Sequence, residues 1–299
     1  MDHSIQNWDD FRIFLAVARH NSLDAAAVGL HQDATTLGRR IRRLEKDIGA
    51  TLLERSRKGH LLTSVGESLF NQAEQIEHLV AEAQEKIGGE AQQVTGTVRL
   101  SVTEAFGNVV IAPALGGFFQ NHPGLNIELV ATSGFLSVSK READLAVLLT
   151  RPTRGRLKIQ KLSDYQLQLY ATAEYLQKNG TPTSTDEIQD HTLIGYVDDL
   201  IYSPSLRYYD EIGSGLSPSL TSSSLLAQKQ LACSDCGIAM LPRFVGEAEH
   251  KLVSVLAQEV CITRTFWLAV HEDIAEHARI RAVKEFLLDL VATCNLDHR

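Results

Sequence analysis

The sequence lacks long apolar runs and is poor in cysteine. No run approaches the ~20 apolar residues of a membrane-spanning helix, which excludes a helical membrane protein. Only four cysteines occur in 299 residues, so a fold held together by disulfides is excluded and a reducing compartment is favoured. The opening segment, MDHSIQNWDD, is polar and acidic, unlike a secretory signal. We therefore expect a globular, cytoplasmic protein with no membrane partner.

Motifs of the common catalytic sites are also missing. The chain has no G-x-x-x-x-G-K-[ST] phosphate loop and no G-x-S-x-G nucleophile turn. His271 and His277 are too far apart for a zinc-binding helix, where the ligands lie one turn apart. Cys233 and Cys236 have C-x-x-C spacing but no second pair, which favours packing over metal binding or redox chemistry. We expect no catalytic residue, cofactor or metal, and an enzyme is the weakest alternative.

Basic charge is scarce overall but concentrated near the N-terminus. The whole chain has a net charge of −8, which by itself argues against nucleic acid as a partner. Residues 1–60, however, carry +2 and the remaining residues −10, and from Arg39 to Lys58 the net charge is +5. Such a patch attracts the phosphates of DNA, whereas the acidic remainder repels them.

The segment from Leu30 to Lys46 has two unlike faces if it forms a helix that begins after Asp33. An apolar stripe recurs at helical spacing, at Leu37, Ile41 and Leu44. The opposite face carries hydroxyl and basic side chains, namely Thr35, Arg39, Arg42 and Lys46. One face can pack on a core while the other offers donors to guanine edges and phosphates, as a helix in the DNA major groove requires.

The surrounding sequence completes a winged helix-turn-helix pattern. Helices are predicted over residues 8–20 and 23–30, and the order helix, turn, helix is typical of DNA-binding modules. Residues 51–63 then predict a β-hairpin with Arg57 and Lys58 at its tip. A basic tip beside such a module indicates a wing that reaches phosphates or the adjoining minor groove.

We assign the predicted DNA contacts to two groups. Base edges are assigned to Thr35, Thr36 and Arg39. Phosphates, which position a protein without reading the sequence, are assigned to the other basic residues of the helix and wing: Arg40, Arg42, Arg43, Arg57 and Lys58. The alternative is a solvated basic face without a partner, which is the usual meaning of a charge run.

Residues 64–87 predict one long helix with an apolar seam. The seam residues alternate by four and three positions: Leu69, Ala73, Ile76, Val80, Ala83 and Ile87. A single helix cannot bury such a seam on itself, so the pattern predicts dimerisation through the same helix of a second subunit. Packing within one subunit is the alternative. Gly88 and Gly89 end the helix, and residues 88–96 are expected to form a hinge.

From residue 97 onward, strands and helices alternate, which is typical of an α/β sheet. Strands are expected at 97–103, 126–131 and 143–149 in a first lobe, and at 167–171, 192–196 and 237–240 in a second lobe. Helices are expected near 109–121 and over 274–292, and the latter is expected to return to the first lobe.

A ligand site is expected at the edge of this sheet, because ligands of α/β sheets bind beyond the carboxyl ends of strands, near helix N-termini. The candidate contacts are polar residues at strand ends and helix starts: Ser101, Thr103, Glu104, Thr132, Ser133, Tyr196, Ser222, Ser223 and Ser224. Hydroxyls and free N–H groups suit a carboxylate ligand, but Glu104 would oppose that charge, so the sign of the ligand stays open. The alternative for the serines and threonines is ordinary helix capping.

Several segments of the sequence resemble the LysR-type transcriptional regulators. The matching N-terminal text is FRIFLAVARHNSLDAAAVGL followed by TTLGRRIRRLEKDIGATLLERSRKGHLLTSVGESL, and the later text is GTVRLSVTEAFG, PALGGFFQNHPGLNIELV, SKREADLAVLL and CGIAMLP. Three positions depart from the family pattern: Gly38 stands where serine is frequent, Ala34 where glutamine is common and Leu53 where phenylalanine is usual. The first two departures leave open which DNA sequence the helix reads. The third is a volume-conserving change in the core.

The resemblance implies an α+β multi-domain fold, with an N-terminal winged helix-turn-helix, a long linker helix and a two-lobed α/β effector domain similar to periplasmic binding proteins. The corresponding ranges are 1–63 for the DNA-binding domain, 64–96 for the linker and hinge, and 97–299 for the effector domain, with lobe I at 97–160 and 270–299 and lobe II at 161–269.

The family likeness also implies a function. Family members usually bind pseudo-palindromic sites on double-stranded DNA as homodimers or homotetramers, under the control of a small molecule held between the lobes. We therefore expect an allosteric, sequence-specific transcriptional regulator, with RNA polymerase as a further candidate partner. The alternative is a small-molecule binding protein whose N-terminal module serves assembly. The effector, the regulated genes and the choice between activation and repression stay open.

Overall fold

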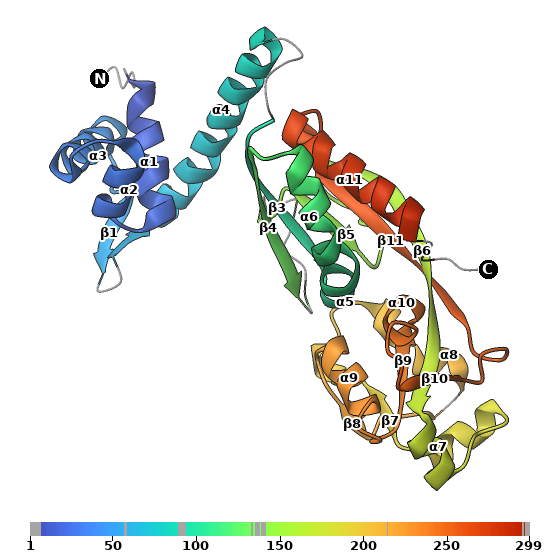
Figure 1. Ribbon diagram of the computed structural model, residues 1–299. Helices are drawn as coiled ribbons and strands as arrows, with labels where there is room; N and C mark the ends of the chain where they lie inside the picture. The colour runs from blue at the N-terminus through green and yellow to red at the C-terminus, as the bar shows by residue number, and fades with distance from the viewer. Residues whose placement is uncertain are drawn as a thin grey trace. The chain divides into compact units, whose positions relative to one another are not determined.

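The structure is a computed structural model, which describes residues 7–56, 59–88, 94–132, 134, 138, 142–213, 215–294 and 296. The chain divides into two compact units, Met1–Gln92 and Gln93–Arg299 (Figure 1). In these described ranges, no helix is both long enough and apolar enough to cross a bilayer.

The first unit contains three short helices, a hairpin and one long helix. Their bounds are α1 Trp8–His20, α2 Leu23–Leu30, α3 Ala34–Ile48, β1 Leu53–Ser56, β2 Gly59–Leu62 and α4 Ser64–Gly88. The predicted helices and hairpin are thus confirmed. Ser22 caps α2, because its side chain accepts the N–H of Ala25. Asp33 caps α3 in the same way and accepts the N–H groups of Thr35 and Thr36.

A compact apolar core holds the helices of the first unit together. Phe14 of α1 and Leu37 of α3 are fully buried, and Leu44 of α3 is 1% exposed. Leu52, just before the hairpin, is also fully buried. The burial of the apolar stripe of α3 fixes which of its faces remains outside, as the sequence predicts.

The hairpin lies against the turn between α1 and α2. Gly59 has a φ of +110°, and a Cβ at this position would lie 2.2 Å from the carbonyl oxygen of Asn21. The same carbonyl accepts the N–H of His60 at 2.8 Å. Because only glycine fits this approach and this φ, Gly59 fixes the hairpin on the helices.

The second unit is built on one mixed sheet, which has nine strands in the described residues. The strands are β3 Gly96–Thr103, β4 Leu125–Thr132, β5 Leu145–Leu148, β6 Leu157–Thr172, β7 Leu193–Gly195, β8 Leu220–Thr221, β9 Ile238–Pro242, β10 Leu252–Val255 and β11 Ile262–His271. Their order is β4-β3-β5-β11-β6-β9-β7-β8, with β10 paired to β6. The α-helices are α5 Glu104–Phe106, α6 Ala112–Asn121, α7 Ala173–Asn179, α8 Tyr209–Ile212, α9 Leu225–Ala232, α10 Arg243–Gly246 and α11 Ala278–Cys294.

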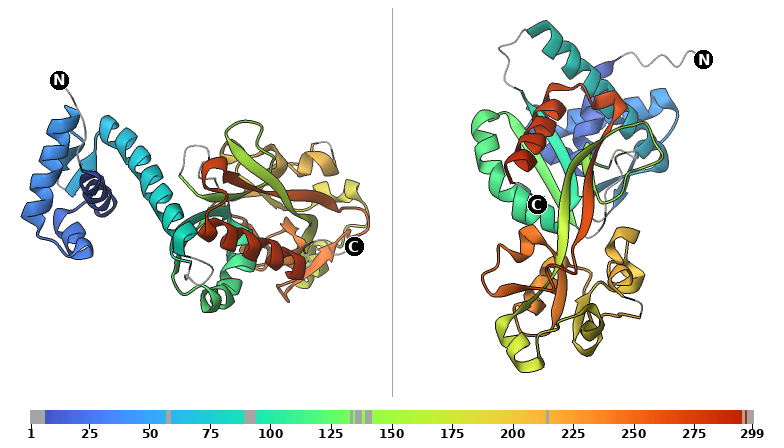
Figure 2. Two further views of the ribbon diagram at one scale, coloured as in Figure 1. Left: turned by 90° about the horizontal axis from the view of Figure 1, so that it is seen from above. Right: turned by 90° about the vertical axis from the view of Figure 1, so that its right-hand side faces the viewer.

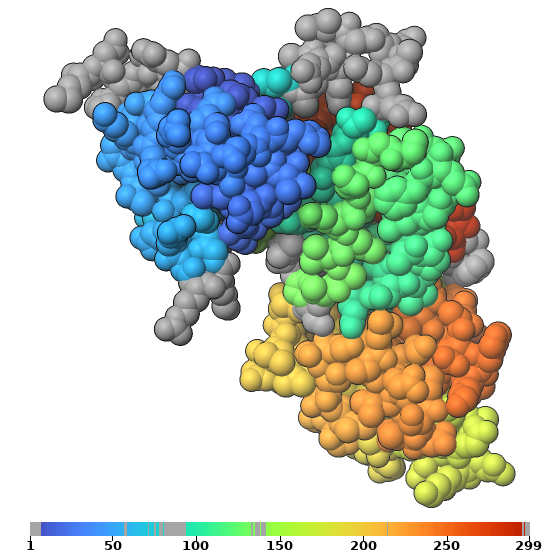
Figure 3. Space-filling model, turned by 60° about the vertical axis from the view of Figure 1, so that its left-hand side comes forward, coloured from blue at the N-terminus to red at the C-terminus, as the bar shows by residue number. Residues whose placement is uncertain are grey.

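Two long antiparallel strands, β6 and β11, join the two lobes of this unit (Figure 2). In the first lobe (β3, β4, β5, α6 and α11) β11 pairs with β5, and in the second lobe (β7, β8, β9 and α9) β6 pairs with β9. Figure 3 shows part of the first lobe in green beside the second lobe in yellow and orange. The lobe boundaries predicted after residues 160 and 269 therefore fall inside β6 and β11 rather than between elements.

The helix expected from residue 109 begins earlier, at Glu104. There α5 continues into a π-helical turn, Gly107–Ile111, and then into α6. Close packing explains this irregular start, because a Cβ on Gly107 would lie 2.6 Å from the Cβ of Ala131 on β4. The turn thus lies directly on the sheet, which makes Glu104 the first helical residue after β3.

The terminal helix α11 packs on the first lobe, as predicted. Its apolar face is buried, with Ile280, Val283 and Leu287 exposed by 1% or less. It begins at Ala278 rather than at 274, because Glu272–Ile274 form a separate 3-10 turn.

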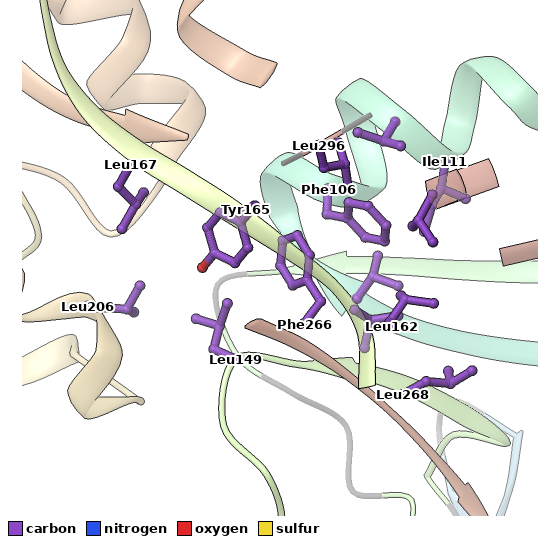
Figure 4. Packing of buried hydrophobic residues seen from close by; sticks show 14 of the residues in the cluster. Phe106, Ile111, Leu149, Leu162, Tyr165, Leu167, Leu206, Phe266, Leu268 and Leu296 are labelled. Carbon is purple, nitrogen blue, oxygen red and sulfur yellow. The ribbon is translucent and has the colours of Figure 1, made fainter. Parts of the chain in front are cut away.

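The core of the second unit is centred on the crossing strands (Figure 4). The ring of Phe266 on β11 stacks on Tyr165 of β6, with centroids 4.1 Å apart, and packs on Phe106 of α5 at 4.6 Å. The hydroxyl of Tyr165 points away from this stack toward Leu149 and Leu206 (Figure 4). The aromatic core therefore continues into the wall of a cleft.

Candidate functional sites

The first candidate site is the outer face of α3. Thr35, Thr36 and Arg39 are exposed on this face, opposite the buried stripe, as predicted. Arg39 has no hydrogen-bond or ion-pair partner among residues 7–56 and 59–88. Its guanidinium is therefore available to an external acceptor such as a guanine edge.

Two further arginines of α3 are exposed but make contacts within the first unit. The Nε of Arg42 donates to the carbonyl of Gly38 at 3.1 Å. The Nε of Arg43 lies 3.9 Å from a carboxylate oxygen of Asp47 and 3.8 Å from one of Asp10. Such exposed contacts are weak and salt-sensitive, so both side chains can reorient toward a phosphate.

Arg40 has different surroundings from the other arginines. It is half-buried, and its guanidinium donates to Asp10 at 2.5 Å and to Asp9 at 2.7 Å, both on α1. The hydrogen bond from Arg40 lowers the pKa of Asp9 below its usual value. Because Asp10 is 3% exposed, Arg40 neutralises a buried carboxylate and holds α3 on α1.

The wing is attached to α3 by one carboxylate. Glu45 Oε1 accepts the N–H of Leu52 at 2.8 Å and that of Leu53 at 3.2 Å, just where β1 begins. The predicted wing contacts Arg57 and Lys58 lie outside the described residues.

The second candidate site is the apolar seam of α4. The structure divides it, because Leu69 and Ala73 pack on the core of the same subunit and Ala73 is fully buried there. Ile76 and Val80 are 38% and 42% exposed. The side chains of the last two seam residues, Ala83 and Ile87, lie outside the described ones. Ala73 is therefore a contact within the subunit, contrary to the sequence prediction, while Ile76 and Val80 remain available to a partner.

Ion pairs tie α4 to α1 beside this seam. Arg19 of α1 donates to Glu74 at 3.1 Å and to Glu77 at 2.7 Å. Although burial opposes the charged form, the two carboxylates raise the pKa of Arg19 above its usual value. The direction of α4 at its base is thus fixed by charge as well as by packing.

The third candidate site is a cleft in the second unit, which is partly open to solvent. Its wall is formed by residues of both lobes: Thr103, Glu104, Ala105, Leu149, Tyr165, Leu167, Tyr196, Tyr202, Ser205, Leu206, Tyr208, Leu225, Pro242, Phe244 and Phe266. Most of these side chains are apolar or aromatic, with a few polar groups among them, which is typical of small-molecule sites.

Glu104 joins the two lobes at this cleft. Its Oε1 accepts the hydroxyl of Ser224 at 2.8 Å, and its Oε2 accepts the N–H of Leu225 at 2.8 Å, at the N-terminus of α9. Ser224 also caps α9, because its Oγ accepts the N–H of Ala227. The carboxylate therefore completes the capping of α9 from the opposite lobe.

The predicted ligand residues separate into two groups. Thr103, Glu104 and Tyr196 line the cleft, and Ser224 contacts it through Glu104. The other predicted residues are absent from its described wall: Ser101, Thr132, Ser222 and Ser223. Ser101 is fully buried inside β3, which leaves it no surface for a ligand, and Ser222 accepts the N–H of Ser224. Ser133 lies outside the described residues.

The aromatic residues of the cleft were missed by the sequence prediction. They are Tyr165, Tyr202, Tyr208, Phe244 and Phe266. Tyr165 and Phe266 lie on the crossing strands, whereas Tyr202 and Tyr208 lie in an irregular segment without periodicity. Burial raises the pKa of Tyr165 and Tyr208 well above the ordinary value, so both stay neutral phenols at physiological pH.

The cysteine pair lies at the C-terminal end of α9. Cys233 is buried, and burial raises the pKa of its thiol. Cys236 is partly buried and donates weakly to the carbonyl of Ser234. In the part of the chain that the structure describes, no group of three or more histidine, cysteine or acidic side chains has the geometry of a metal site.

Two protein families match the chain. The family described as "Bacterial regulatory helix-turn-helix protein, lysR family" matches residues 8–67, and the family described as "LysR substrate binding domain" matches residues 91–292. The first match spans α1 to the start of α4, and the second spans nearly all of the second unit.

Individual relatives match over almost the full length. The HTH-type transcriptional regulator CrgA of Neisseria meningitidis is 28% identical over 292 residues, which cover 95% of this chain and 96% of that protein. A solved structure of CrgA is 27% identical, covers 95% of this chain and 98% of its own, and superposes with a TM-score of 0.60. A full-length OxyR variant from Pseudomonas aeruginosa covers 98% of this chain and 99% of its own with a TM-score of 0.72, and at 16% identity it shows the fold alone.

Proposed function

The chain belongs to the LysR family of DNA-binding transcriptional regulators, and we propose that a small molecule in its cleft controls how the first unit binds DNA. The observation that carries the DNA-binding function is the division of α3 into two faces. Its apolar stripe is buried, while Thr35, Thr36 and Arg39 are exposed. A helix held this way offers donors and hydroxyls to base edges from a fixed position.

The DNA contacts that we propose follow from these surroundings. Base edges are assigned to Thr35, Thr36 and Arg39. Phosphates are assigned to the exposed arginines of α3 and to the wing, namely Arg42, Arg43, Arg57 and Lys58. Arg40 receives another role, because Asp9 and Asp10 hold its guanidinium. It positions α3 rather than binding a phosphate.

The quaternary structure that we propose is a homodimer, or a tetramer built from it, paired through the exposed part of α4 near Ile76 and Val80. Twofold symmetry then presents two copies of α3 to two half-sites, so the target is a pseudo-palindromic duplex. Such a complex forms in the cytoplasm, where RNA polymerase is a further candidate partner.

Control by a ligand is supported by the fact that both lobes contribute residues to the cleft wall. Thr103 and Glu104 come from the first lobe, and Tyr196 and Leu225 come from the second. A ligand that contacts both lobes binds one lobe arrangement better than another and shifts the equilibrium between them. This differential affinity is the free energy available to change DNA binding, and the coupling is reciprocal.

Selection of genomic fragments by the purified full-length protein tests this function. Fragments of the source genome are captured, washed at rising salt and sequenced, and Arg39→Ala serves as the matched sample. We expect a small set of enriched fragments that share a pseudo-palindromic motif, and weaker enrichment for the variant. If a stable oligomer enriches no fragment over the input, the N-terminal unit serves assembly and the proposed function is wrong.

A further inference from the structure

The N-terminus of α9 lies at the cleft and attracts negative charge, and the protein occupies it with its own carboxylate. Helix N-termini expose unpaired N–H groups and a partial positive charge, so they favour anions. Glu104 accepts both the N–H of Leu225 and the hydroxyl of Ser224 at this position. An anionic ligand cannot take these donors while Glu104 holds them.

The guanidinium of Arg264, which is paired with Glu211, donates to the carbonyl of the wall residue Ser205 at 3.4 Å. Glu104 brings a negative charge to the wall itself. Among the described residues of the wall, it has the only side chain that is charged at neutral pH. Its field reaches the aromatic side chains, because burial and then the negative charge of Glu104 raise the pKa of Tyr202 to about 12. A second negative charge in the cleft would meet the same repulsion.

The remaining wall favours an apolar ring. Tyr165, Tyr196, Tyr202, Phe244 and Phe266 all contribute to it. Tyr165 and Phe244 pack edge to face with centroids 6.3 Å apart, and Tyr165 presents its hydroxyl to the space beside Leu206 (Figure 4). Rings of this kind bind flat apolar groups and tolerate positive charge at their faces, whereas negative charge is disfavoured there.

We propose that the effector is a small molecule with an apolar ring and no negative charge, and that Glu104 excludes organic anions from the cleft. This inference rests on the proposed function, in which the cleft is the effector site. Exclusion has two causes: the donors of α9 are already taken, and the carboxylate repels a second anion. Removal of the charge at position 104 therefore opens the cleft to carboxylates.

The test compares benzyl alcohol and benzoate, two probes that share a ring and differ in charge. Their affinities for the full-length protein are measured by ligand-detected NMR titration. The wild type is expected to bind benzyl alcohol and to bind benzoate about tenfold more weakly, which corresponds to about 1.4 kcal/mol. In Glu104→Gln, benzoate is expected to bind about tenfold more tightly than in the wild type, with benzyl alcohol little changed.

Two further variants sharpen the test. Glu104→Ala frees the N–H of Leu225 and is expected to show the same gain for benzoate. Glu285→Gln, which removes a carboxylate from the exposed face of α11, is the control and is expected to leave both affinities unchanged.

Several results would overturn the proposal: equal binding of both probes by the wild type, no gain of benzoate in either Glu104 variant, the same gain in Glu285→Gln, or no binding of either probe to any of the proteins. Duplex binding by the same samples is measured separately. A wild type that discriminates between the probes but does not bind duplex would count against the proposed function. A wild type that binds duplex but does not discriminate between the probes would count against the exclusion of anions.

Discussion

At the scale of single residues, Arg39 and Arg40 show how neighbours with the same charge take different roles. Arg39 is exposed and has no partner in the described part of the first unit, whereas Arg40 is held by Asp9 and Asp10. One step along a helix rotates the side chain by about 100°, which moves it from the outer face to the contact with α1. The surroundings of each arginine, rather than its residue type, decide whether it contacts DNA bases or positions α3.

Replacement of Arg39 tests the assignment of base contact. We expect Arg39→Ala to weaken binding to the selected operator by about 1–3 kcal/mol, because a bidentate contact with guanine is lost. Binding to random duplex is expected to change much less. Arg281→Ala, at an exposed position on α11, is the matched control. Equal losses on operator and random DNA, measured by fluorescence anisotropy, would show that Arg39 contacts phosphate instead.

Replacement of Arg40 tests its positioning role through stability. Arg40→Ala leaves the buried Asp10 without its hydrogen-bonded cation and with only Arg43, 3.8 Å away, and we expect the free energy of unfolding at pH 7 to fall by about 1–2 kcal/mol. Arg12→Ala is the control, since Arg12 is a 51% exposed partner of Asp9 and its loss is expected to cost less than about 0.5 kcal/mol. Equal losses in urea unfolding would contradict this role.

The same contact predicts a pH dependence. Arg40 lowers the pKa of Asp9 below 3.8 in the folded state. The contribution of the Arg40–Asp9 contact to folding stability is therefore complete above the pKa of Asp9 in the unfolded chain, and it is lost as pH falls through the lower pKa in the folded protein. The difference in stability between wild type and Arg40→Ala should therefore shrink below about pH 4. A difference that stays constant from pH 7 to pH 3 would contradict the assignment.

At the scale of elements, the first unit could be predicted because its signals are local. Asp33 caps α3, and Leu37, Ile41 and Leu44 repeat at helical spacing within the same segment. The hairpin likewise has its turn signal next to its strands. Such patterns need no knowledge of distant residues, so the sequence alone predicts these elements, with bounds that differ by a few residues, and the buried face of α3.

The cleft could be predicted only in part, because its wall is assembled from distant segments. Thr103 and Glu104 follow a strand and carry a local signal. Strand β11, in contrast, is recognised only through its pairing with β6 about a hundred residues earlier. Tyr202 and Ser205 lie in short 3-10 and irregular stretches that have no periodicity. The anchoring of Glu104 on α9 likewise joins elements that sequence spacing cannot bring together.

The exposed part of α4 is an element whose role can be tested directly. Val80→Glu places a charge in the proposed seam, and we expect the dimer to dissociate at least about tenfold more readily in analytical ultracentrifugation, because a buried unpaired charge is costly. Val253→Glu, at a 41% exposed position on β10, is the control. An unchanged oligomer in Val80→Glu would place the interface elsewhere.

At the scale of the whole molecule, charge is divided in a way that suits a regulator. The first 60 residues carry +2, while the remainder carries −10. Nucleic acid is therefore attracted to the helices and hairpin within residues 1–60 and repelled from the acidic remainder of the chain. Because binding energies are linked, any ligand that weakens DNA binding must itself bind less tightly to the DNA-bound protein.

Salt dependence of duplex binding tests the central claim most directly. If two subunits place their basic faces on one duplex, about eight phosphate contacts are made, and the affinity should fall about 10³- to 10⁵-fold between 50 and 200 mM salt. The measurement is an anisotropy titration of the full-length dimer on its selected operator. We predict this steep, linear dependence of log K on log salt. An affinity that hardly changes over the same range would contradict the assignment of the first unit to DNA.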